Sequence, residues 1–172
     1  MALGDADFAA RARALRWMLC DVDGVLTDGR LYYGAGEPLV AFDIKDGYAM
    51  KAARRSGLKV GILTGRNTPA VAARAADLAL DATILGREDK GAAFDEFLGR
   101  AQCDAAQIAY LGDDLLDLPV LMRAGLSLCP SDAAAEVRAA VHRVLVRAGG
   151  RGAVREAVEA ILGARGAWPP AP

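Results

Sequence analysis

The stretch Asp21-Val22-Asp23-Gly24-Val25-Leu26-Thr27-Asp28 points to both the fold and the chemistry of this chain. It follows an apolar run at 15–20 that is typical of a buried strand. Side chains two residues apart on a strand share a face, so Asp21 and Asp23 are expected to emerge together at the strand's carboxyl end, where open α/β sheets bind ligands. Two close carboxylates repel each other unless a cation or a shared proton relieves them. The pair predicts a Mg²⁺ site with a carboxylate nucleophile beside a carboxyl acid, although Asp-Gly alone is also ordinary turn chemistry.

The composition favours one compact, soluble, cytoplasmic domain. The chain has 172 residues, of which 53% are hydrophobic and 25% charged. Its 21 basic residues balance 22 acidic ones, so no basic field indicates a nucleic-acid partner. No apolar run is long enough to span a membrane, and Asp5 and Asp7 stand where a signal peptide would be basic or apolar. We therefore expect neither nucleic acid nor membrane as a partner.

Few residues are available for nucleophile-and-base chemistry of the serine or cysteine type. The three cysteines, Cys20, Cys103 and Cys129, cannot complete a disulfide set and lack metal-ligand spacing; Cys20 and Cys129 are expected to be small buried hydrophobes. The only histidine, His142, lies in an alternating stretch and is expected at a polar strand position. A Ser-His or Cys-His mechanism would have to use it, and such mechanisms are therefore disfavoured.

Short apolar runs alternate with helical patterns along the chain. Strands are expected at 15–21, 58–63, 81–85, 107–111, 125–129 and 141–146. Helices are expected at 47–56, 69–80, 90–100, 115–124, 133–140 and 153–162. This alternation predicts an α/β fold with a doubly wound, mostly parallel sheet.

One segment interrupts the alternation. Residues 30–33 and 39–43 predict a β-hairpin around a turn at 34–38. The segment between Asp23 and Thr64 is too short for a separate cap domain. We expect a single domain over 1–172 with a core at about 15–162 and a flexible tail at 163–172.

Polar motifs follow three further predicted strands. Thr64-Gly65-Arg66 could bind phosphate oxygens, although a threonine here is also a common helix cap. Lys90 stands at the start of a helix, where the helix dipole disfavours a cation; such local conflicts often mark functional sites. In Gly112-Asp113-Asp114-Leu115-Leu116-Asp117, Asp113 is the better metal-ligand candidate and Asp114 can be a helix N-cap. A parallel sheet would gather these motifs with Asp21 and Asp23 at one edge.

In combination the motifs resemble those of the haloacid dehalogenase superfamily of phosphatases. The resemblance runs from about residue 17 to 162, and within the superfamily it is to the small cap-less branch typified by 3-deoxy-D-manno-octulosonate 8-phosphate phosphatase. It implies a Mg²⁺-dependent enzyme of lipopolysaccharide precursor synthesis that hydrolyses a small sugar phosphate. It also implies a homotetramer in which hairpins such as 30–43 assemble around a central axis.

The resemblance assigns roles to individual residues. Asp21 would attack phosphorus and form an aspartyl-phosphate, and Asp23 would act as acid and then base. Mg²⁺ would be held by Asp21, Asp113 and the backbone carbonyl of Asp23, with Asp114 or Asp117 acting through water. The residues expected to bind phosphate or substrate are Thr64, Gly65, Arg66, Lys90 and Arg151. Apart from the resemblance, Arg66 is the first candidate to bind the carboxylate of the sugar acid, because it directly follows Thr64-Gly65; Arg151 is the second, although it could equally be a solvated arginine.

Three alternatives remain. A phospho-accepting receiver domain would need an aspartate at the end of the strand before Thr64, and this chain has none there. A non-catalytic oligomerisation domain derived from a phosphatase would be expected to lose a catalytic acid. A sister phosphatase for a nine-carbon keto-sugar acid 9-phosphate is expected to carry glutamate after Thr64-Gly65; Arg66 at that position favours the eight-carbon substrate.

Overall fold

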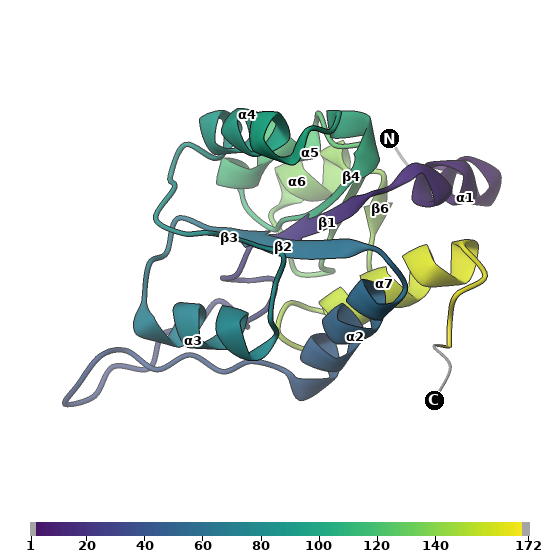
Figure 1. Ribbon diagram of the computed structural model, residues 1–172. Helices are drawn as coiled ribbons and strands as arrows, with labels where there is room; N and C mark the ends of the chain where they lie inside the picture. Colours follow the sequence, from purple (N-terminus) through teal and green to yellow (C-terminus); the bar gives the residue numbers. More distant parts are fainter. Residues whose placement is uncertain (1–2, 170–172) are drawn as a thin grey trace.

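The chain forms an open parallel sheet between two layers of helices (Figure 1). The structure is a computed structural model that describes residues 3–169. Within these residues, six strands pair in the order β3-β2-β1-β4-β5-β6, and every pairing is parallel. The strands are β1 (Trp17–Cys20), β2 (Lys59–Leu63), β3 (Ala82–Ile84), β4 (Ile108–Leu111), β5 (Leu126–Cys129) and β6 (Arg143–Val144). The predicted α/β class and parallel sheet are confirmed.

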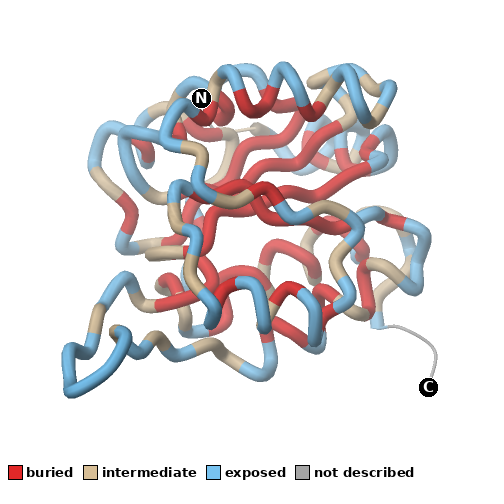
Figure 2. Tube along the Cα trace, turned by 60° about the vertical axis from the view of Figure 1, so that its left-hand side comes forward, coloured by how far each residue is buried: buried red, intermediate tan, exposed pale blue. Residues whose placement is uncertain are grey.

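The helices cover both faces of the sheet and bury two hydrophobic clusters. One cluster lies under α1 (Asp5–Ala14), α2 (Ile44–Arg55), α3 (Pro69–Asp77) and α7 (Ala153–Ala164). The other lies under α4 (Lys90–Ala101), α5 (Leu118–Leu121) and α6 (Ala135–Ala140). Because both faces are covered, central strands such as β1 and β4 are buried at every position, as Figure 2 shows in red. This explains why they read as continuous apolar runs.

Helix α1 was not predicted from the sequence. Asp5 and Asp7 lie in its first turn, and Arg11 and Arg13 in its last, which complements the helix dipole. Phe8 and Ala12, one turn apart, are its buried side chains. The apolar face is therefore narrow and the periodic signal weak, but the charge distribution could have indicated the helix.

Several other helices differ from their predicted bounds, and capping explains the start of α2. Helix α2 begins at Ile44, three residues earlier than expected, since the Asp43 carboxylate accepts a hydrogen bond from the backbone N–H of Lys45 at 2.7 Å. The helix expected at 115–124 is a 3₁₀ turn, η2 (Leu115–Asp117), followed by the short α5. A second 3₁₀ turn, η1 (Ala105–Gln107), precedes β4.

The predicted hairpin is reduced to a single antiparallel bridge. Tyr32 and Leu39 exchange two backbone hydrogen bonds of 3.2 and 3.0 Å, and no regular strand extends from them. Gly34, Gly36 and Pro38 disfavour an extended ladder here. The segment projects from the body of the molecule (Figure 1) and leaves large apolar side chains exposed.

The remaining sequence expectations can be placed on the fold. Cys20 and Cys129 are buried free thiols, as predicted. His142 directly precedes β6, and its Nδ1 lies 2.8 Å from Ser127 Oγ, in contact with the sheet. In the expected tail, α7 continues to Ala164 and Trp168 packs against the first cluster; residues 170–172 lie outside the described residues, and tail mobility stays a prediction. None of the helices in residues 3–169 combines the length and apolar character needed to cross a membrane.

Candidate active site

The predicted motifs meet at the carboxyl edge of the sheet. Asp21 follows β1, Thr64 follows β2, Asp113 follows β4, and Lys90 opens α4 after β3. The strand order reverses at β1, where such folds bind ligands. Here lies a cavity of about 630 Å³, which we call the edge cavity. It is lined by Asp21, Asp23, Gly24, Gly29, Thr64, Gly65, Arg66, Asn67, Glu88, Lys90, Asp113, Asp114, Leu116 and Asp117.

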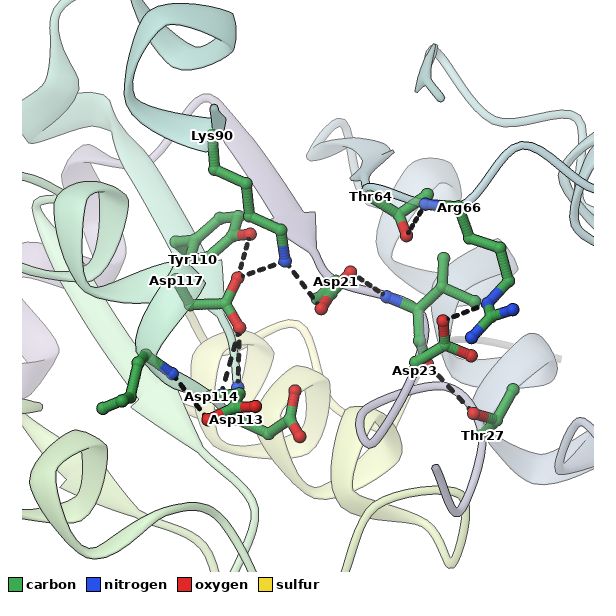
Figure 3. A network of polar contacts seen from close by, with 12 residues as sticks. Asp21, Asp23, Thr27, Thr64, Arg66, Lys90, Tyr110, Asp113, Asp114 and Asp117 are labelled. Atoms are coloured by element: carbon green, nitrogen blue, oxygen red, sulfur yellow. Dashed lines mark hydrogen bonds and ion pairs between the residues drawn. The ribbon is translucent and has the colours of Figure 1, made fainter. Parts of the chain in front are cut away.

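Asp21 is fixed from both sides of its carboxylate (Figure 3). Oδ1 accepts a hydrogen bond of 2.7 Å from the backbone N–H of Val22, and Oδ2 lies 2.6 Å from Lys90 Nζ. Burial and the neighbouring Asp117 raise the pKa of Asp21 to about 6, against the opposing effect of Lys90. The side chain therefore has one orientation, at the floor of the edge cavity.

Lys90 is the central cation of the site. Its side chain is only 3% exposed, and Nζ lies between Asp21 Oδ2 at 2.6 Å and Asp117 Oδ1 at 2.7 Å. Burial alone would lower the pKa of Lys90, but the two carboxylates outweigh it and raise the pKa. The ammonium thus stays charged. Its unfavourable position at a helix start, noted in the sequence, is compensated by these ion pairs and by the Asp89 cap, whose Oδ1 accepts from Ala92 N at 2.9 Å.

Asp117 is fully buried, and both of its oxygens are saturated. Oδ1 accepts from Tyr110 Oη and Lys90 Nζ, each at 2.7 Å. Oδ2 accepts from the backbone N–H groups of Asp113 at 3.0 Å and Asp114 at 3.3 Å. Gly112 is required here, because a Cβ at that position would lie 2.5 Å from Asp117 Cγ. Sequence reasoning placed Asp117 near the metal; the structure shows it as an organiser of the network.

Asp113 has the character of a cation ligand. Its Oδ1 is buried and accepts no hydrogen bond within the described residues. Burial, with Asp117 and Asp21 nearby, raises the pKa of Asp113 to about 7. Oxygens of Asp21, Asp113 and Asp117 lie within 4.8 Å of one another. Since Asp117 is saturated, the oxygens of Asp21 and Asp113 are the ones that fit a hard divalent cation.

Gly24 and Asp114 complete the metal-binding region. A Cβ on Gly24 would lie 2.0 Å from Asp113 Oδ2, and its φ is +72°, so only glycine is accommodated. Asp114 caps η2 by accepting from Leu115 N at 2.8 Å, as its N-cap interpretation predicted, and its exposed side chain still lines the edge cavity.

Asp23 is paired with Arg66, a contact not predicted from the sequence. Arg66 Nε, in the loop after β2, donates to Asp23 Oδ2, in the loop after β1 (Figure 3). The backbone N–H of Arg66 donates to Thr64 Oγ1 at 3.1 Å, which leaves the threonine hydroxyl proton free to donate. The guanidinium therefore lies at the mouth of the edge cavity, next to the second carboxylate of the motif.

Arg151 does not line the edge cavity. It is 68% exposed in the turn before α7, and it lies 3.7 Å from Asp28. Its neighbours Gly149 and Gly150 instead pack on the loop that carries Asp23: a Cβ on Gly149 would lie 1.8 Å from Gly24 O, and Gly150 N donates to Val25 O at 2.9 Å. Sequence reasoning singled out the arginine and missed this backbone clamp.

Comparison with curated proteins identifies the family. The chain is 42% identical over 157 residues to the 3-deoxy-D-manno-octulosonate 8-phosphate phosphatase of Yersinia pestis, with 91% of this chain and 84% of that protein covered. The chain belongs to the 3-deoxy-D-manno-octulosonate 8-phosphate phosphatase family. The Escherichia coli K12 member is 41% identical over 162 residues and covers 94% and 86% of the two chains. No family model matches the chain.

Solved structures of this family and of the wider superfamily share the fold. The Moraxella catarrhalis phosphatase, in complex with magnesium, phosphate and KDO, superposes with a TM-score of 0.91 at 32% identity over 94% of each chain. The cobalt-bound Haemophilus influenzae enzyme gives 0.87 at 39% identity, covering 91% and 92%. A haloacid dehalogenase superfamily hydrolase from Legionella pneumophila gives 0.92 at 33% identity, covering 94% and 90%. The resemblance stated from the motifs is confirmed.

Proposed function

We propose that this chain is a Mg²⁺-dependent phosphatase that hydrolyses 3-deoxy-D-manno-octulosonate 8-phosphate to the free sugar acid and phosphate. The observation that carries the proposal is the fixed Asp21 carboxylate, beside a buried lysine and an unpartnered Asp113 oxygen in one cavity. Family membership supports the substrate, and with it a step in lipopolysaccharide precursor synthesis in the cytoplasm.

The two acids of the first motif divide the chemistry. Asp21, held in one orientation, attacks phosphorus and forms an aspartyl-phosphate as the sugar oxygen departs. Asp23 gives that oxygen a proton and then takes one from the water that cleaves the intermediate. Its partly exposed side chain at the cavity mouth suits contact with both the leaving group and water.

The remaining residues balance charge on the phosphoryl group. The Thr64 hydroxyl, the Gly65 backbone and the Lys90 ammonium are the donors that line the edge cavity. Asp21, Asp113 and the backbone carbonyl of Asp23 would hold Mg²⁺, with Asp114 acting through water. When bound there, Mg²⁺ would supply positive charge that offsets the repulsion between the carboxylate nucleophile and the phosphate.

Arg66 is the candidate for the substrate's carboxylate. A guanidinium can hold a carboxylate through two parallel hydrogen bonds, and Arg66 is already engaged with one at the cavity mouth. Arg151 would act only across a subunit boundary, since it lies outside the cavity of its own chain.

A panel of sugar phosphates with Mg²⁺ tests the substrate. We expect kcat/KM to be highest for the eight-carbon acid, lower for nine-carbon acid 9-phosphates and lowest for hexose phosphates. Arg66→Ala should raise KM for the acids far more than for the hexose phosphates, because only the acids offer a carboxylate. A preference for neutral hexose phosphates would overturn the substrate assignment and leave the phosphatase assignment standing.

A further inference from the structure

Tyr110 lies beneath the candidate active site and outside the edge cavity. It is part of β4 and is fully buried, and its hydroxyl reaches the polar network under the cavity floor (Figure 3). The hydroxyl donates to Asp117 Oδ1 at 2.7 Å. Any effect of this hydroxyl on the reacting atoms must therefore pass through Asp117.

Two carboxylates compete for the one ammonium of Lys90. Nζ lies 2.6 Å from Asp21 Oδ2 and 2.7 Å from Asp117 Oδ1. In a low-dielectric interior each contact is strong, and the position of the ammonium follows the balance between them. The distance of the ammonium from Asp21 and from the edge cavity therefore depends on how strongly Asp117 attracts it.

The other donors to Asp117 weaken that attraction. Its four hydrogen bonds come from Tyr110, Lys90 and two backbone N–H groups, so its negative charge is shared among several partners. Without the Tyr110 hydroxyl, Lys90 would be the only donor to Oδ1, and the ammonium would move toward Asp117 and away from Asp21. A phenylalanine would fill nearly the same space, so packing alone does not require the hydroxyl.

We propose that Tyr110 is a positioning residue that directs the Lys90 ammonium toward Asp21 and the phosphoryl group by satisfying Asp117. The inference rests on the proposed phosphatase function. It predicts that loss of the hydroxyl lowers turnover and phosphate affinity but does not lower Mg²⁺ affinity, because Asp21 and Asp113 keep their oxygens and an ammonium farther from Asp21 repels the metal ion less.

Tyr110→Phe tests this directly. We expect kcat to fall about tenfold, and the affinity for inorganic phosphate in the presence of Mg²⁺, measured by calorimetry, to fall by a similar factor. Mg²⁺ affinity should not fall below the wild-type value. Ile108→Val is the matched control, since it trims a buried side chain of the same strand that makes no polar contact with the network; it should lower Tm and leave kcat and phosphate affinity unchanged.

A double-mutant cycle that combines Tyr110→Phe with Asp117→Asn tests whether the Tyr110 hydroxyl acts on Lys90 through Asp117. A neutral amide attracts the ammonium less, so Tyr110→Phe should change phosphate affinity little in that background. The inference would be overturned if Tyr110→Phe kept the wild-type phosphate affinity, or lowered it no more than Ile108→Val does. It would also be overturned if Tyr110→Phe lowered phosphate affinity as much in the Asp117→Asn background as in the wild type. Absence of Mg²⁺-dependent turnover in the wild-type chain would instead refute the proposed function, and the phosphate-affinity comparison would still decide the role of Tyr110.

Discussion

At the scale of single residues, three carboxylates surround the single ammonium of Lys90 in the candidate site. Asp21, Asp113 and Asp117 converge within 4.8 Å, and Lys90 offsets only part of their charge. Burial raises the pKa of Asp21 to about 6 and that of Asp113 to about 7, and the neighbouring carboxylates add to both shifts. The site therefore binds either protons or a cation, and the two compete.

This competition predicts opposite pH trends with and without metal. The folded chain holds protons on Asp21 and Asp113 at a pH where the unfolded chain, with Asp pKa near 3.8, has lost them. In EDTA, the free energy of unfolding should therefore decrease as pH rises from about 5 to 8. Mg²⁺ requires the ionised carboxylates, so the Tm increase that it causes should grow over the same range.

Calorimetric melting of the EDTA-treated protein and of the protein with Mg²⁺, from pH 5 to 8, checks both trends. Asp113→Asn should abolish the Mg²⁺-dependent increase and flatten part of the slope in EDTA. A Tm increase independent of pH would contradict the assignment of the metal to these carboxylates.

At the scale of elements, the turn before α7 fixes the loop that follows β1. Gly149 packs closely against the carbonyl of Gly24, and the backbone N–H of Gly150 donates to Val25 O. The backbone of the turn before α7 therefore fixes the backbone of the loop after β1, although the two segments are far apart in sequence. Glycine is needed because any side chain at 149 would enter the loop that carries Asp23.

Gly149→Ala should therefore disturb both stability and catalysis. The added Cβ, 1.8 Å from Gly24 O, must displace the loop, and we expect a loss of about 1–3 kcal/mol in the free energy of unfolding with a clear fall in kcat. Denaturant unfolding and steady-state kinetics measure the two effects. Gly99→Ala is the control: it lies in α4 with nothing within 4 Å of its Cβ, and should stabilise by about 0.5–1 kcal/mol. Unchanged kcat in Gly149→Ala would show that the contact is incidental.

Elements were predictable from the sequence where local pattern and tertiary burial agree. The strands β1, β2 and β4 were found because they are buried almost throughout, and the polar residues that follow them, Asp21, Thr64 and Asp113, marked the site. Helix α1 was missed because only two of its side chains are buried. The helix predicted at 115–124 is shorter than expected, because a 3₁₀ turn precedes α5 and a proline lies in the first turn of α5. The pairs Lys90–Asp117 and Arg66–Asp23 join residues 27 and 43 positions apart, and no spacing rule on a single chain encodes such contacts.

At the scale of the whole molecule, the projecting segment at 30–43 predicts assembly. Tyr33 is 79% exposed and Leu39 71% exposed on a segment tied by one bridge. Burial of such a side chain contributes about 1.5–3 kcal/mol, and a neighbouring subunit could supply it. A neighbour at this position would also limit water at an edge cavity that has no cap domain in this fold.

We therefore propose a homotetramer and expect light scattering at assay concentration to give four times the chain mass. Tyr33→Asp with Leu39→Asp should dissociate the assembly and leave each chain folded, because both side chains are exposed and Tyr33 lies outside both core clusters. Circular dichroism provides the folding control. A monomeric wild-type protein, or a variant that stays tetrameric, would count against this segment as the interface.

The central claim is that the Asp21 carboxylate is the nucleophile of a Mg²⁺-dependent phosphatase, and its most direct test is the kcat of Asp21→Asn at saturating Mg²⁺ and substrate. We expect a loss of at least about 10³-fold in phosphate release, because an amide cannot form the aspartyl-phosphate. Asp28→Asn, in the same loop but paired with Arg151 away from the reacting atoms, should retain turnover within a few-fold of wild type. Turnover by Asp21→Asn within about tenfold of wild type would contradict the account.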